Sequence, residues 1–139
     1  MSEIKENILI GKIIEHIYLS KDKLSIKFCL STGEEIIAKC DADCCSSTWI
    51  ENIEDPENII NSYVIYAEDI KLITSEMDDD CGVIRFYGFK IKTSKGECII
   101  DYRNESNGYY GGSLVFPGDE FYGGVYGQNV SKEEWIKLI

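Results

Sequence analysis

Alternating apolar and polar residues predict strands along most of this chain. Every second residue from Leu24 to Leu30 is apolar, which is the period of a half-buried strand. Thr32-Gly33 then predicts a turn, and Glu35–Cys40 predicts a partner strand. Further strands are predicted over residues 8–19 with an interruption near Gly11, over 63–67, 70–75 and 113–116, and over 84–102 with a turn at Lys95-Gly96.

The alternation changes phase at Gly88. Ile84 and Phe86 have one parity, whereas Phe89 and Ile91 have the other. One extra residue in the strand would restore the alternation, so the pattern predicts a β-bulge at Gly88.

Local signals predict two or three short helices. Thr48-Trp-Ile-Glu51 and Ser131-Lys-Glu-Glu134 match the capping box that opens a helix. Pro56 suits the first turn of a helix over 56–61. With the predicted strands, these segments indicate an α+β fold with a mainly antiparallel sheet.

The predicted hairpins resemble each other. Ser31-Thr-Gly-Glu-Glu-Ile-Ile37 aligns with Ser94-Lys-Gly-Glu-Cys-Ile-Ile100 at an offset of 94 − 31 = 63 residues. This match predicts an internal duplication of a three-stranded meander, over residues 6–45 and 68–108. The alternative is that antiparallel hairpins with a glycine turn resemble each other without duplication.

The composition indicates one globular domain, residues 1–139, with a strongly acidic surface. The net charge of −11 repels nucleic acid and anionic membranes, and it favours a protein partner with a basic surface. The first residues match no signal pattern and no apolar run is long enough to span a membrane, so we expect a cytoplasmic protein with reduced cysteines.

The chemistry-bearing residues do not predict an enzyme. Cys40, Cys44 and Cys45 are weak candidates for a metal site, because adjacent cysteines chelate poorly and no paired Cys-x-x-Cys knuckles are present. His16 is the single histidine and has no nucleophile motif beside it. We therefore expect neither catalysis nor a cofactor, although a metal-dependent hydrolase built on the cysteine and aspartate loops stays an alternative.

The segment after the predicted strand 98–102 has the composition of a recognition loop. It combines polar side chains, tyrosines and glycines, which suit contact with a partner better than burial in a core. We expect six of its residues to form the binding surface: Arg103, Asn104, Asn107, Tyr109, Tyr110 and Tyr122. Alternatively, these residues fold back over the sheet edge, or they hold a nucleotide signal with Arg103 on phosphate and a tyrosine stacked on the base.

The segments Asp43–Glu51 and Arg103–Leu114 resemble a family of small, uncharacterised domains found in bacteriophages and prophage-bearing genomes. The resemblance covers residues 8–116 and implies a phage or mobile-element origin, with no reaction or substrate attached. With the acidic charge, it leads us to expect a non-catalytic inhibitor that binds a basic surface of a bacterial defence protein.

Overall fold

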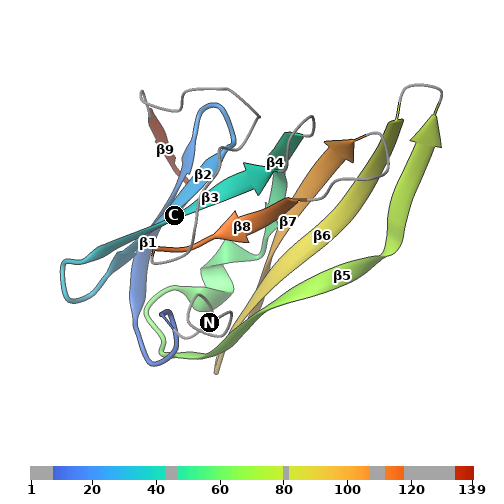
Figure 1. Cartoon of the computed structure of the whole chain (residues 1–139). Helices are drawn as coiled ribbons and strands as arrows, with labels where there is room; N and C mark the ends of the chain where they lie inside the picture. The colour runs from blue at the N-terminus through green and yellow to red at the C-terminus, as the bar shows by residue number, and fades with distance from the viewer. Residues whose placement is uncertain (1–7, 43–46, 80–81, 107–111, 118–133) are drawn as a thin grey trace.

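The chain folds into two antiparallel sheets, as Figure 1 shows for the computed structural model. The structure describes residues 8–42, 47–79, 82–106, 112–117 and 134–139. The first sheet has the order β8-β3-β2-β1-β9 and contains β1 (Ile14–Ser20), β2 (Ser25–Leu30), β3 (Glu35–Ala42), β8 (Gly112–Val115) and β9 (Trp135–Lys137). The second has the order β4-β7-β6-β5 and contains β4 (Ser47–Glu54), β5 (Val64–Asp79), β6 (Gly82–Thr93) and β7 (Gly96–Ser106).

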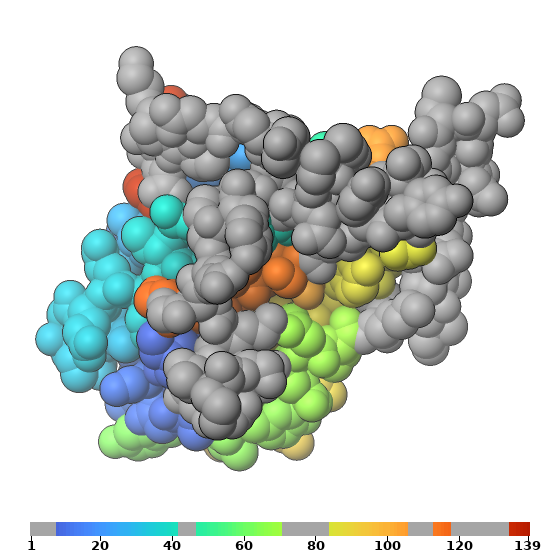
Figure 2. All heavy atoms as spheres, viewed as in Figure 1, coloured from blue at the N-terminus to red at the C-terminus, as the bar shows by residue number. Residues whose placement is uncertain are grey.

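The core lies between the two sheets. Alternate residues of β2 and β3 meet alternate residues of β6 and β7 in one buried cluster. Phe116, directly after β8, joins the layers, with its ring centroid 6.4 Å from that of Phe28 and 5.0 Å from that of Phe89. In the space-filling view, blue and cyan atoms of the first sheet lie on the left, and green and yellow atoms of the second lie on the right (Figure 2). The architecture is a β-sandwich.

The α+β prediction was wrong, because the described elements are strands apart from one short 3-10 helix. That helix, η1 (Pro56–Ile59), falls within the predicted helix over 56–61. The other two predicted helices are replaced by edge strands. The capping box at Thr48 lies in β4, and Trp135–Lys137 pairs with β1 as β9.

Tertiary pairing overrode the local helix signal in β4. Thr48 and Ile50 are buried against the core, whereas Trp49 and Glu51 point to the other face, so this segment also has the period of a strand. β7 supplies a ladder of backbone hydrogen bonds from Ser47 to Glu54, which a capping box cannot match.

The predicted bulge at Gly88 was also wrong. The ladder between β6 and β7 runs through Gly88 without a register shift. The two irregularities of the neighbouring ladder lie in β5, between Val64 and Tyr66 and between Lys71 and Glu76. The structure gives another reason why glycine suits position 88. A Cβ atom there would lie 3.0 Å from Cγ1 of Ile70 and 3.3 Å from Cγ2 of Ile99. The side chains of two neighbouring strands therefore fill the space above Gly88.

Backbone hydrogen bonds also connect the edges of the two sheets. Gly11 N–H donates to the Val64 carbonyl at 2.8 Å, and Val64 N–H donates to the Lys12 carbonyl at 2.9 Å. On the opposite side, Ile50 N–H donates to the Lys23 carbonyl at 2.8 Å. These bonds hold β5 beside the start of β1, and β4 beside the β1–β2 turn.

Both predicted hairpins form, one in each sheet, but their turns differ by one residue. Phe28 pairs with Ile36 in the first hairpin, and Ile91 pairs with Cys98 in the second. The offset of 63 therefore relates the inward residues of β2 and β6, whereas the inward residues of β3 and β7 are related by 98 − 36 = 62. The duplication stays a prediction, and this register relates Cys40 to Tyr102.

Candidate functional site

Arg103 lies on the outer face of the second sheet, beside an aromatic and acidic cluster. Its guanidinium group stacks on Phe86, with Cζ 4.2 Å from the ring centroid. Nη2 donates to Oδ2 of Asp101 at 3.4 Å, and Nη1 lies 3.9 Å from Oε1 of Glu51. Trp49 Nε1–H donates to the same oxygen of Glu51 at 2.9 Å.

These contacts hold Arg103 in place and neutralise its charge. Two carboxylates flank the guanidinium group, so a phosphate at this position would lie close to both of them. The arrangement gives little support to a phosphate grip by Arg103. It instead presents a preorganised surface of one tryptophan, one phenylalanine and one arginine, which are side chains that suit a protein interface.

Asn104 lies on the opposite face of β7 and has a structural role. Its side chain is fully buried, with 0% exposure, and its amide donates to Thr48 Oγ1 at 3.0 Å. This bond joins the inner faces of β7 and β4. The expectation that Asn104 contacts a partner directly is therefore corrected, because the sandwich interior covers the amide group.

The remaining residues of the predicted surface, Asn107, Tyr109, Tyr110 and Tyr122, lie outside the described residues, as do Cys44 and Cys45. The described strands fix where the first loop begins and ends. β7 runs to Ser106 in the second sheet, and β8 starts at Gly112 in the first. The segment 107–111 therefore connects the two sheets at the end of the strand that carries Arg103.

Of the three described cysteines, Cys40 and Cys98 are buried thiols and Cys29 is half-buried. Burial, followed by the charges of Asp22 and Asp41, raises the pKa of Cys40 well above its usual range. Burial also raises the pKa of Cys98 to about 12, with further contributions from Asp55, Glu57 and Glu54. Metals and electrophiles react with the thiolate form, so the environment of Cys40 disfavours the chemistry predicted for it. Across the described segments, no three His, Cys, Asp or Glu residues gather as a metal site.

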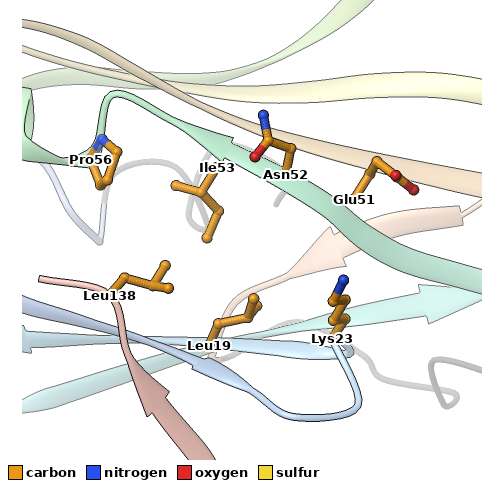
Figure 3. A pocket seen from close by; sticks show the side chains of 7 residues that line it. All are labelled: Leu19, Lys23, Glu51, Asn52, Ile53, Pro56 and Leu138. Carbon is orange, nitrogen blue, oxygen red and sulfur yellow. The ribbon is translucent and has the colours of Figure 1, made fainter.

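A pocket of about 310 Å³ opens beside β4, between the edges of the two sheets (Figure 3). Its apolar wall is formed by Leu19, Ile53, Pro56 and Leu138, and its polar residues are Lys23, Glu51 and Asn52. In Figure 3 the two charged side chains lie toward one end, and Leu138 and Pro56 lie toward the other. The pocket is thus amphipathic.

Sequence reasoning missed this pocket because its lining comes from four separate segments. Leu19 belongs to β1, Lys23 to the β1–β2 turn, and Leu138 follows β9. The β4 residues were assigned to a helix, which would place their side chains differently. One local signal was available, since Lys23 stands at a turn position where glycine or asparagine is usual.

Exposed carboxylates follow β4 into η1. We call Glu51, Glu54, Asp55 and Glu57 the acidic edge, and all four side chains are exposed. Three of them, Glu54, Asp55 and Glu57, contribute after burial to the raised pKa of Cys98. Among the described residues, the one ion pair made by this group joins Glu51 to Arg103. The acidic edge therefore carries a concentrated negative charge beside the pocket and the Arg103 cluster.

A family model covers most of the chain that forms these surfaces. The model is described as a domain of unknown function, DUF7448, and it matches residues 7–116. The chain belongs to this family. The match includes every strand except β9, and it ends at Phe116, the residue that joins the two layers of the core. The DUF7448 domain is thus the sandwich itself, together with the acidic edge and the Arg103 cluster.

No curated protein and no solved structure matches the chain. The described residues of this DUF7448 protein contain no helix long and apolar enough to cross a membrane.

Proposed function

We propose that this DUF7448 protein is a non-catalytic binding protein that captures a partner by binding a basic surface of that partner. The observation that carries the proposal is the position of the acidic edge, next to the cluster of Trp49, Phe86 and Arg103. Interfaces combine desolvated aromatic and arginine anchors with a polar rim, and complementary charge at the rim accelerates association. The acidic edge supplies that charge, and the net charge of −11 extends it.

The proposed partner is a component of a bacterial defence system, and the proposed setting is a phage or prophage gene expressed in the host cytoplasm. Nucleic-acid-binding channels of defence proteins are basic because they neutralise phosphates. An acidic sandwich that occupies such a channel would exclude the nucleic acid by competition. In this proposal Tyr109 and Tyr110, at the end of the strand that carries Arg103, add aromatic contacts to the same surface.

Reversing charges on the acidic edge tests the proposal. We expect Glu54→Lys with Glu57→Lys to slow association with the captured partner about tenfold or more, because steering by a complementary field contributes about 10–1,000-fold to association rates. Partners captured from a host lysate on the immobilised protein would be purified, and their association rates measured at two salt concentrations. The expected salt dependence is also weaker for the variant.

The matched control is Glu15→Lys with Glu34→Lys, two exposed carboxylates outside the acidic edge. Each pair changes the net charge equally, to −11 + 4 = −7. Equal slowing by both variants would contradict a localised interface and leave only a general effect of charge. A second variant, Tyr109→Ala with Tyr110→Ala, should weaken capture while the Tm stays within a few degrees of that of the unmodified protein.

A further inference from the structure

We infer that the pocket in Figure 3 is a binding site for a small amphipathic zwitterion of the apolar α-amino-acid class. Its volume of about 310 Å³ is at the lower end of the range of about 300–1,000 Å³ that ligand pockets occupy, so it suits a ligand smaller than a nucleotide. This site goes beyond the proposed capture of a basic partner and does not depend on it.

The backbone at Lys23 is unusual for a lysine. Its φ angle is +64°, in the left-handed region that glycine adopts freely and that other L-residues adopt at a cost. The two other described non-glycine residues with positive φ are Asp55 and Asn61, which are residue types that tolerate this region. Unfavourable backbone conformations are concentrated at functional sites, so the lysine at this position points to a role for its ammonium group.

Hydrogen bonds fix the backbone of Lys23 beside the pocket. Its N–H donates to the Ser20 carbonyl at 2.9 Å, and its carbonyl accepts from Ile50 N–H at 2.8 Å. The turn that carries Lys23 is therefore held against β4. The ammonium group extends from this fixed point into the polar end of the pocket (Figure 3).

Glu51 is the opposite charge at the same end of the pocket. It occupies the register shift between Ile50 and Asn52, where β4 has one residue more than β7. Such bulges redirect a side chain and are frequent beside binding sites. Within the described chain, both contacts of this carboxylate engage Oε1, one from Trp49 and one from Arg103.

Lys23 and Glu51 face one pocket but form no ion pair with each other within the described structure. An α-amino acid carries a carboxylate and an ammonium group on the same carbon, so it can place one against each residue. The carboxylate would accept from Lys23 Nζ and the ammonium group would donate to Glu51, both as charge-assisted hydrogen bonds. The apolar side chain would then lie against Leu19, Ile53 and Leu138, which removes its surface from water.

The test is a titration of the full chain with L-leucine, followed by NMR of the methyl groups of Leu19, Ile53 and Leu138. We expect saturable shifts of these signals. 4-Methylpentanoate, which lacks the ammonium group, and leucinamide, which lacks the carboxylate, should each bind roughly 10–100-fold more weakly, because each loses one charge-assisted hydrogen bond. An absence of saturable shifts with leucine, or equal binding of 4-methylpentanoate, would overturn the inference.

Lys23→Gly separates binding from folding. Glycine suits the positive φ angle, so the Tm should stay the same or rise, while affinity for leucine falls roughly 10–100-fold and affinity for leucinamide does not change. Lys21→Ala is the control, since it removes the same charge from the same turn outside the pocket. Leucine binding that survives Lys23→Gly would show an adventitious apolar contact. Tighter binding of N-acetyl-leucine would assign the pocket to a peptide and refute the amino-acid class.

Discussion

Replacing Phe116 with alanine is expected to lower the free energy of unfolding by about 3–5 kcal/mol, the usual loss for a buried phenylalanine. Phe116 is 1% exposed, and it contacts Phe28 of the first sheet and Phe89 of the second. Truncation would remove the ring that connects the two layers and leave a cavity between them. Urea denaturation followed by tryptophan fluorescence measures the change.

A surface control distinguishes this effect from a general loss of aromatic side chains. Tyr63 is 65% exposed, so Tyr63→Ala should change the free energy of unfolding by less than about 0.5 kcal/mol. A small loss for Phe116→Ala, comparable with that control, would mean that the sheets do not pack through Phe116. The position of this residue at the end of the DUF7448 match would then have no structural explanation.

Replacing Gly88 with valine is expected to lower the free energy of unfolding by about 1–3 kcal/mol, the usual cost of overpacking. The first added carbon would already lie 3.0 Å from Cγ1 of Ile70, on the neighbouring strand. Valine has a high strand propensity and Gly88 lies in a regular ladder, so a stabilising effect would be expected if the space above it were open.

The double variant Gly88→Val with Ile70→Ala tests the cause of that loss. Removing the Ile70 side chain opens the space, so the double variant should lose less free energy of unfolding than the sum of the two single variants. Additive losses would mean that a clash with the Ile70 side chain is not the cause. They would instead support a special backbone geometry at Gly88. Both outcomes can be measured by urea denaturation of the four proteins.

The strands with clear alternation were predicted correctly from the sequence. The hairpins 24–40 and 84–102 depend on local period and on turns at Gly33 and Gly96, where the structure has positive φ angles of 94° and 141°. The helix assignments failed where a local motif competed with long-range pairing. The capping box at Thr48 is a local signal, whereas the hydrogen bonds from Glu54 and its neighbours to β7 join residues nearly fifty positions apart and outweigh it.

The candidate functional residues show the same division between what local signals predict and what long-range pairing decides. Arg103 was identified from residue type, but its position against Asp101 and Glu51 depends on which strands pair. Asn104, its neighbour, was assigned to the same surface although adjacent residues of a strand point to opposite faces. With β7 extended to Ser106, the alternation buries Asn104 and places Arg103, half-buried, on the outer face.

The sequence by itself determined the strand-rich character, the first hairpin and the acidic charge of this protein, because period, turn residues and ionisable groups are properties of short segments. Only the tertiary structure decided that two sheets pack around Phe116, that Trp49 and Arg103 share one face, and that Lys23 and Glu51 meet at one pocket. These features join residues far apart in the chain. Their contacts depend on strand order and register, which local pattern does not specify.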